Sequence, residues 1–162
     1  MKVGIVGHEA AKFTPQTEAT ARRFIRGYLK GGARDLNLAV VSGACHLGGI
    51  DIWAIEEARA LGLPTVQHPP EKRQWEGGYK QRNILIAEDS DVVLSIVVRE
   101  LPATYTGMRF EFCYHCRTKS HVKSGGCWTA KYAQRLGKRG TIIIIHGDDW
   151  SIETLGLNRG YS

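Results

Sequence analysis

Short apolar runs separated by helical patterns constrain the fold of this chain more than any other feature. The runs carry few polar residues, which is typical of strands buried on both faces of a sheet. They lie at residues 2–6, 38–41, 65–67, 91–98 and 141–145. Between them, apolar residues recur every three or four positions, as at Phe24, Ile25 and Tyr28. We therefore predict an α/β fold, namely a Rossmann-like, doubly wound parallel sheet of five strands with four crossover helices.

No linker, internal repeat or low-complexity segment divides the chain. Its 162 residues suit one unit, so we expect residues 1–162 to form a single domain. Residues 99–126 are too many for an ordinary connection, and we interpret them as a functional or metal-ordered insertion before the last helix. After His146 we expect only a short turn around Asp148–Trp150.

The net charge of +6 favours anionic partners such as nucleotides, nucleic acid or phosphorylated metabolites. Lys and Arg are spread along the chain without a long basic block, which gives nucleic acid only modest support. The apolar run at 2–6 is too short for a signal peptide, and no stretch reaches the roughly 20 apolar residues of a membrane span. We expect a cytoplasmic protein with no membrane partner. In that compartment, the four cysteines suggest metal binding or free thiols rather than disulfides.

A glycine-rich loop at Ser124-Gly125-Gly126 directly precedes a helical pattern. Glycine lets the backbone approach a ligand closely, and the first N–H groups of a helix have no partner within it. With the helix dipole, this makes a seat for a phosphate. Two similar segments, Gly7-His8 and Ser42-Gly43-Ala44, follow other predicted strands. Because ligands bind beyond the carboxyl ends of parallel strands, we expect the three segments to form one crevice.

Charged side chains on the predicted helices could complete this crevice. Arg82 can hold a phosphate bidentately and Asn83 can bond a sugar or base edge, or both can lie on a solvated helix face. Asp51 could bind a ribose hydroxyl or serve as a helix N-terminal charge. His8 could contact the ligand or act as a cap. The residues expected to bind the ligand are Gly7, His8, Ser42, Gly43, Ala44, Gly49, Asp51, Arg82, Asn83, Ser124, Gly125, Gly126 and Thr129.

Four Cys and His residues near the glycine loop have the spacing of a metal site. Cys113, Cys116, His121 and Cys127 follow the pattern C-x2-C-x4-H-x5-C, one residue longer than a zinc knuckle. Such a set suits tetrahedral zinc, and His115 could replace one ligand. The alternative is free thiols with surface histidines. The fourth cysteine, Cys45, is interpreted as structural, and Trp128 could be core or a stacking surface for a base.

Together these motifs resemble the SLOG superfamily of Rossmann-like proteins. This group includes the lonely-guy phosphoribohydrolases (often labelled lysine decarboxylases), the DNA-processing protein DprA and the YspA/YpsA-like proteins. The resemblance covers residues 3–145 and is strongest to the small YspA-like members. Its carriers are Val41-Ser42-Gly43-Ala44, Gly48-Gly49-Ile50-Asp51, Gln81-Arg82-Asn83, Asp89-Ser90-Asp91 and Ser124-Gly125-Gly126-Cys127-Trp128-Thr129.

The phosphoribohydrolase loop reads G-G-x-G-T-x-x-E, and its Glu and an upstream Arg support cleavage of an N-glycosidic bond. The resemblance matches Gly125, Gly126 and Thr129 to this loop and makes Arg82 the catalytic arginine of an enzyme. Trp128 replaces the third glycine, and Tyr132 stands where the Glu would be. Whether the chain is an enzyme therefore stays open, with Glu100 and Glu111 of the insertion as other carboxylates.

Three functions follow from these residues. The first is binding of a nucleotide or nucleotide-derived ligand. The second is an N-glycosidase acting on a nucleoside monophosphate, and the third is DprA-like or zinc-knuckle nucleic-acid binding. The resemblance also implies a homo-oligomer.

Overall fold

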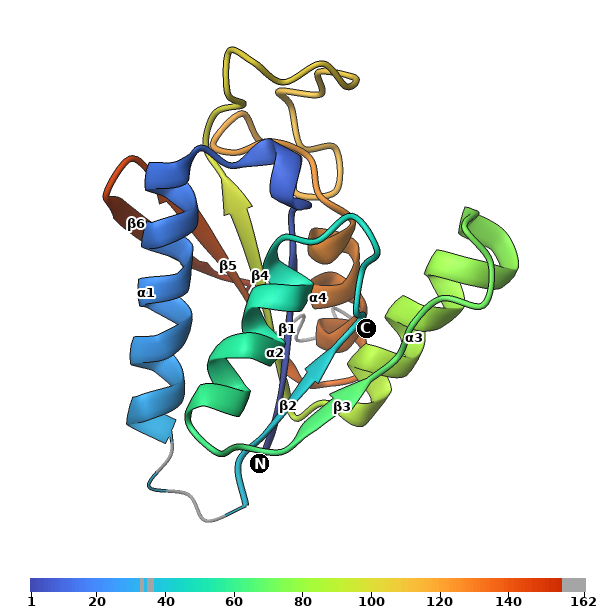
Figure 1. The fold of residues 1–162 in the computed structure, drawn as a ribbon. Coiled ribbons are helices and arrows are strands. Elements are labelled where there is room, and N and C mark those ends of the chain that lie inside the picture. Colours follow the sequence, from blue (N-terminus) through green and yellow to red (C-terminus); the bar gives the residue numbers. More distant parts are fainter. Residues whose placement is uncertain (33, 35–36, 156–162) are drawn as a thin grey trace.

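The computed structural model describes residues 1–32, 34 and 37–155, which form an α/β fold around one six-stranded sheet (Figure 1). The predicted domain also includes residues 33, 35–36 and 156–162, which lie outside the described residues. The strands are β1 (Lys2–Gly7), β2 (Ala39–Ser42), β3 (Thr65–Gln67), β4 (Val92–Val98), β5 (Arg139–His146) and β6 (Asp149–Thr154). Their order is β3-β2-β1-β4-β5-β6, and all neighbours are parallel except the pair β5–β6. The predicted α/β class with a largely parallel sheet is confirmed.

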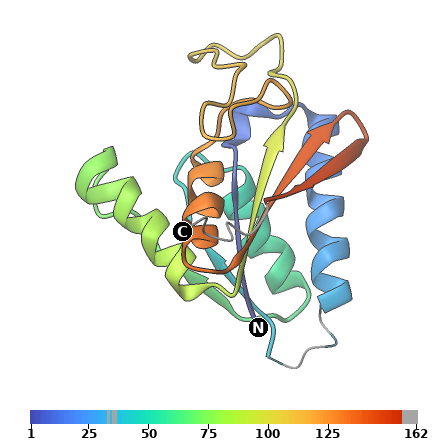
Figure 2. The same cartoon turned by 180° about the vertical axis from the view of Figure 1, so that it is seen from behind.

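Helices cover both faces of the sheet (Figures 1 and 2). One face carries α1 (Pro15–Gly32) and α2 (Ile50–Ala60), and the other carries α3 (Lys80–Asp89) and α4 (Gly125–Arg135). The buried apolar side chains accordingly form two cores. One core includes Ile25 and Trp53, and the other includes Ile86 and Ala130. No helix of the described residues is long and apolar enough to cross a membrane.

The predicted number of five strands is wrong, because the segment after His146 folds back as β6. It pairs antiparallel with β5, with Trp150 opposite Ile145. Trp150 packs edge-on against Phe24 of α1 at 5.4 Å between ring centroids. Most other β6 side chains are exposed, as expected for an edge strand, so the segment lacks the apolar pattern that marks the interior strands.

The start of the first helix is fixed by reciprocal bonds between two threonines. The Thr17 N–H donates to Thr14 Oγ1 at 3.1 Å, and the Thr14 N–H donates to Thr17 Oγ1 at 2.8 Å. Pro15 then occupies the first helical position. Each threonine side chain thereby pairs a backbone N–H that the helix leaves free, as in a capping box.

The long segment between β4 and α4 lies over the carboxyl end of the sheet (Figure 1). Its described residues form one isolated bridge, between Cys113 and Thr118. They form no extended strand before α4 begins at Gly125. Several bonds tie the segment to the strand ends and the loop after β1; for example, Val122 N–H donates to Val98 O at 3.0 Å, and Tyr105 Oη donates to Glu9 Oε1 at 3.4 Å. Two short helical turns also lie near this end, η1 (Ala10–Lys12) and η2 (Trp75–Tyr79).

Candidate functional site: a crevice beside a Cys/His cluster

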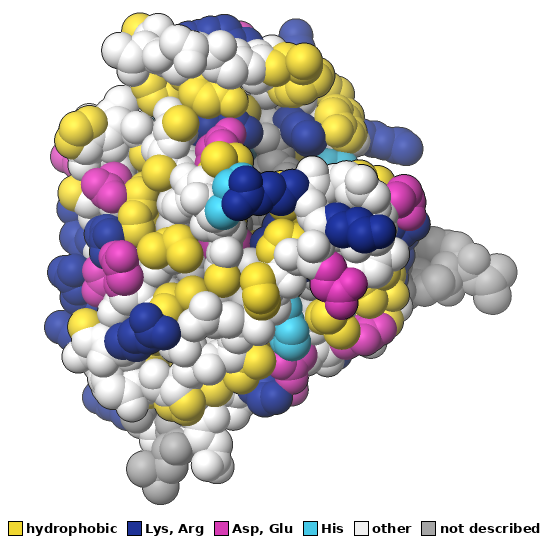
Figure 3. Space-filling view, turned by 45° about the vertical axis from the view of Figure 1, so that its right-hand side comes forward, with side chains coloured by type: hydrophobic (Ala, Val, Ile, Leu, Met, Phe, Trp, Pro, Cys, Tyr) yellow, Lys and Arg dark blue, Asp and Glu magenta, His cyan; other side chains and the backbone are white. Residues whose placement is uncertain are grey.

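A cavity of about 260 Å³ opens at the carboxyl end of β1, beside the N-terminus of α4. Nine of the thirteen predicted ligand residues line it: Gly7, His8, Asp51, Arg82, Asn83, Ser124, Gly125, Gly126 and Thr129. The other four, Ser42, Gly43, Ala44 and Gly49, are not among its lining residues. Figure 3 shows the face on the α3 side of the molecule, where basic side chains are interspersed with acidic and apolar ones. We call this cavity the crevice.

The glycine loop presents the start of α4 to the crevice. Ser124 is the N-cap, and its Oγ accepts a hydrogen bond from the Gly126 N–H at 3.0 Å. The Cys127 N–H donates to Ser124 O at 3.1 Å. Within the described residues, the Gly125 N–H makes no hydrogen bond. The helix therefore directs one free donor and the positive end of its dipole toward the crevice.

Glycine at position 126 is required by close packing. A Cβ there would lie 2.8 Å from Ser95 Oγ of β4 and 3.1 Å from the Gly7 backbone of β1. Such contacts are too short for a methyl group, so only glycine lets α4 sit this close to the two central strands. At Gly125, by contrast, an added Cβ would meet no atom within 4 Å.

Arg82 is held rigidly at the crevice wall. Its Nη1 donates to Gly43 O at 3.0 Å, its Nε donates to Asn83 Oδ1 at 2.9 Å, and its guanidinium lies 5.4 Å from the Tyr79 ring centroid. A Cβ on Gly43 would come within 2.3 Å of Arg82 Nη1. Gly43 therefore acts on the crevice through Arg82, by accepting its hydrogen bond and by leaving it space.

Asp51 places a buried carboxylate beside this arginine. Its Oδ2 lies 3.5 Å from Arg82 Nη1 and accepts a bond from the Cys45 N–H at 3.3 Å. Burial raises the pKa of Asp51 to about 6, against the opposing effects of Arg82 and of the Cys45 and Gly7 N–H groups. Ser42 supports the same element, since its Oγ donates to Asp51 O at 2.8 Å.

His8 is a structural link between the strands and the glycine loop. Its Nε2 lies 2.8 Å from Lys123 O, and its Nδ1 accepts from the Val98 N–H at 3.0 Å. Because Nδ1 accepts, Nε2 carries the proton and donates to Lys123 O. Burial, and next the charge of Lys12, lower the pKa of His8 to about 3, so the ring is neutral. Both ring nitrogens are occupied, which favours the capping interpretation of His8.

The sequence analysis missed several crevice residues. Lys12 and Lys123 bring two further cations, and the pKa of Lys12 is lowered by burial although Glu9 lies 3.6 Å away. Lys123 directly precedes Ser124, so its position beside the loop could have marked it. Trp75 and Tyr79 form an aromatic wall from η2, an element that has no regular apolar pattern. The remaining lining residues are Val6, Glu9, Cys45 and Leu47.

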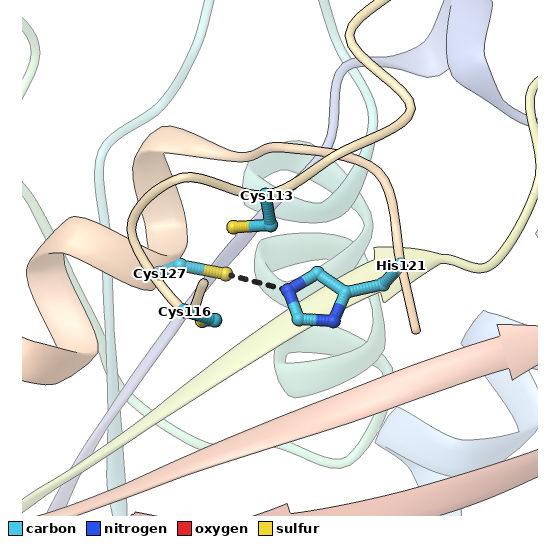
Figure 4. A group of neighbouring side chains, drawn as sticks. All are labelled: Cys113, Cys116, His121 and Cys127. Carbon is cyan, nitrogen blue, oxygen red and sulfur yellow. Dashed lines mark hydrogen bonds between the residues drawn. The ribbon is translucent and has the colours of Figure 1, made fainter. Parts of the chain in front are cut away.

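Cys113, Cys116, His121 and Cys127 form one cluster that could hold a metal ion (Figure 4). Their ligand atoms all lie within 4.8 Å of one another. The two-way backbone bonds between Cys113 and Thr118 close a tight turn that carries the first two cysteines, and Cys127 projects from the first turn of α4. Ligands converge in this way around a tetrahedral metal ion.

The surroundings of the cluster orient its ligands. His121 is fully buried, its Nε2 lies 3.6 Å from Cys127 Sγ, and its Nδ1 lies 3.0 Å from Ser120 Oγ. A hydrogen bond to the second ring nitrogen fixes the orientation of a ligating imidazole, and Ser120 provides that partner here. Hydrogen bonds from Cys116 and Cys127 lower the pKa of Cys113. Donation to Cys113 raises the pKa of Cys116 to about 11. The pKa of Cys127 is also raised, for the same reason. A bound cation would instead favour thiolates at all three positions.

The cluster and the crevice share the start of α4. Gly126 lies against Gly7, and the next residue, Cys127, belongs to the cluster. Among the described residues, His115 is outside the cluster and Cys45 lies at the crevice. Tyr132 stacks on Trp128 at 5.2 Å between ring centroids and does not line the crevice, and neither do Glu100 or Glu111. The carboxylates at the crevice are instead Glu9 and Asp51.

Comparisons with protein-family models, with curated proteins and with solved structures find no match to this chain. The functional argument therefore rests on the residues and their geometry.

Proposed function

We propose that the crevice binds a nucleotide or a nucleotide-derived small molecule, with a phosphate at the N-terminus of α4. The observation that carries this proposal is the free Gly125 N–H at a helix start that shares one cavity with Arg82, Lys12 and Lys123. A helix N-terminus with convergent cations is a favourable site for a phosphate. The aromatic wall of Trp75 and Tyr79 offers a surface for the base, and Asn83 and Asp51 offer bonds to sugar hydroxyls.

Thermal unfolding with a panel of nucleotides tests this proposal. A nucleotide at 100 times its Kd should stabilise the protein by about 2.7 kcal/mol. Arg82→Ala should weaken binding at least about tenfold, because it removes a cation from the phosphate. Arg59→Ala is the matched control, since Arg59 is exposed on α2 and does not line the crevice. If no nucleotide stabilises the protein at millimolar concentration, the proposal is wrong.

We further propose that the metal of the Cys/His cluster is zinc. Three thiolates and one imidazole are a common ligand set for structural zinc, whereas oxygen-preferring cations would find no carboxylate in the cluster. Zinc would be a structural ion here, since its four ligands would leave no open position for catalysis.

Elemental analysis of purified protein checks the metal directly. About one equivalent of zinc is expected, and Cys113→Ser or Cys116→Ser should lose it. Cys45→Ser should keep it, because this cysteine is not in the cluster. Retention of zinc by Cys113→Ser, or a folded protein without metal, would contradict the proposal.

A second candidate function is cleavage of a nucleoside monophosphate at its N-glycosidic bond. It is favoured by Asp51, a buried carboxylate at the crevice that could stabilise an oxocarbenium-like state. Arg82 would hold the phosphate. Release of free base by the purified protein, and its loss in Asp51→Asn and Arg82→Ala, would support this function. Nucleotides that bind and stay intact would exclude it and leave the binding proposal standing.

Membership of the SLOG superfamily is likewise a proposal. Two of the motifs that carry the resemblance, Arg82-Asn83 and Ser124–Thr129, contribute residues to the crevice, and Gly43 accepts a hydrogen bond from Arg82, which supports it. The homo-oligomer that the resemblance implies can be tested by light scattering on the purified chain.

A further inference from the structure

A second hollow of about 380 Å³ lies between the Cys113–Thr118 turn and the outer face of α4. Tyr114, His115 and Arg117 line it from the turn. From α4 it is lined by Trp128, Lys131, Tyr132 and Arg135. We call it the groove. It shares no lining residue with the crevice.

The α4 residues form one stripe, because positions 128, 131, 132 and 135 follow the i, i+3, i+4, i+7 spacing of a single helix face. The opposite face of α4, with Cys127, Ala130 and Ala133, is buried against the sheet. Of the outer stripe, Tyr132 packs partly against this core, Trp128 and Lys131 are half-buried, and Arg135 is exposed. The composition of the stripe, two aromatic rings and two cations, differs from the mixed charges of an ordinary solvated face.

The groove is basic and aromatic. Arg117, Lys131 and Arg135 line it without any acidic residue, and none of them forms an ion pair with a described residue. The surrounding sequence shares this bias. Residues 99–135 hold seven Lys and Arg against two Glu, so a net charge of +5 out of +6 lies in this stretch. The positive excess of the chain is therefore concentrated in the insertion and α4, the two segments that line the groove.

The aromatic rings of the groove are ordered and partly open to solvent. Trp128 and Tyr132 stack with an interplanar angle of 8°, and Trp75 contacts Trp128 edge-on at 5.2 Å. On the opposite wall Tyr114 is 51% exposed, and Lys123 Nζ lies 5.3 Å from its ring centroid. Further exposed rings, Phe110 and Phe112, lie just before this turn.

We infer that the groove binds single-stranded nucleic acid. Cations that follow a backbone, together with rings on which bases stack, are the two components of sequence-tolerant single-strand binding. An acidic peptide would satisfy only the cations, and a duplex keeps its bases stacked within itself. The groove therefore favours an unpaired strand over either alternative.

Fluorescence anisotropy with labelled dT15 and the full chain tests this inference. Binding at low salt should weaken as KCl rises, with a slope of log K against log[salt] near −2 for three phosphate contacts at ~0.7 each. A 15-base-pair duplex should bind at least about fivefold more weakly than dT15. No binding of dT15 at low salt, or tighter binding of the duplex, would overturn the inference.

Charge variants locate the site. Lys131→Gln with Arg135→Gln should weaken dT15 binding about tenfold or more and reduce the slope to about −0.7. Lys30→Gln with Arg59→Gln is the matched control: it changes the net charge equally at exposed positions of α1 and α2, on the other face of the sheet. Its binding should equal that of the unaltered protein. Equal losses in the two double variants would mean that net charge alone attracts the strand. The inference that the groove is the binding site would then be wrong.

Two further measurements separate the groove from its alternatives. Trp128→Ala should weaken dT15 binding about tenfold and Trp128→Phe should restore most of it, because stacking needs a ring. Poly-glutamate of equal charge should compete poorly, and equal competition would contradict a role for base stacking. Arg82→Ala should leave dT15 binding unchanged, so a failure of the nucleotide proposal and a failure of this one are distinguishable.

Discussion

At the scale of single residues, burial shifts the pKa values of two crevice residues, Asp51 and His8, in opposite directions, so that their usual order is reversed. Burial raises the pKa of Asp51 to about 6 and lowers that of His8 to about 3. Between about pH 4 and 6, the folded state holds a proton on Asp51, whereas the unfolded state holds it on His8. The two states then bind equal numbers of protons at this pair. The pH dependence of stability that Asp51 causes is therefore cancelled by that of His8 in this range.

Asp51→Asn should reveal the effect of His8. Asp51 alone makes the free energy of unfolding fall as pH rises from about 4 to 6, because its folded-state pKa lies above the unfolded value. The free energy of unfolding of the variant minus that of the unaltered protein should therefore rise between pH 4 and 6, by about 3 kcal/mol in total. Urea unfolding at half-unit pH steps measures this difference.

Asp148→Asn is the control for this measurement, because Asp148 is exposed and does not line the crevice. Urea unfolding of this variant over the same pH range gives the comparison. A constant difference for Asp51→Asn would mean that Asp51 does not titrate above its ordinary value in the fold.

Glycine or a position after a strand marks several crevice residues in the sequence, although the same marks also selected Ser42 and Gly43, which do not line the crevice. Among the crevice residues, Ser124, Gly126 and Gly7 are marked in this way. Lys12 and Trp75 were not predictable in the same way, since neither lies in a motif. Lys12 reaches the crevice because η1 turns the chain back over the end of β1, and Trp75 reaches it from the irregular η2. Such placements depend on loop conformations that periodicity does not encode.

At the scale of secondary structure, α4 is the element on which both the crevice and the metal cluster depend. The sequence analysis placed Gly125 and Gly126 in a loop before this helix, but the helix starts at Gly125 because Ser124 caps it. This shift places the glycines in the first turn of the helix. The fold of the interior strands was predictable because they are apolar throughout, whereas β6 was not, because an exposed edge strand lacks that signal.

The two neighbouring glycines allow a sharp test of how α4 is seated. Gly126→Ala should destabilise the protein by about 1–3 kcal/mol, because its methyl group would collide with Ser95 and Gly7 and push the helix off the sheet. Gly125→Ala should change the free energy of unfolding by less than about 1 kcal/mol, because its methyl group meets no neighbour. Denaturant unfolding of both variants gives the comparison, and equal losses would argue against this close packing.

At the scale of the whole molecule, the crevice and the Cys/His cluster lie at the carboxyl end of the sheet, and the groove extends from the Cys113–Thr118 turn along the outer face of α4. Residues 99–124 supply ligands of the cluster and one wall of the groove, while α4 contributes to all three. Among the described residues, no residue of the crevice or of the cluster lies at the amino end of a parallel strand. A parallel sheet explains this polarity, because all its strands direct their carboxyl ends to one edge.

This arrangement predicts that a bound metal and a bound nucleotide stabilise each other. Without metal, Cys127 loses its attachment to the Cys113–Thr118 turn, and the first turn of α4 is less fixed where the phosphate would bind. Metal-free protein that remains folded should therefore bind a nucleotide about 5- to 150-fold more weakly, the usual range of coupling between sites. Calorimetry with and without one equivalent of zinc measures the change, and circular dichroism verifies the fold.

Linkage requires the effect to be reciprocal, so a saturating nucleotide should raise zinc affinity by the same factor. Competition with a chromogenic chelator measures this second affinity. Cys45→Ser keeps all four cluster residues and should show the same coupling as the unaltered protein, provided that the loss of its thiol at the crevice does not alter nucleotide binding. If nucleotide affinity is identical with and without metal, the start of α4 keeps its geometry without the ion. The cluster would then stabilise the insertion alone, and the crevice would be independent of it.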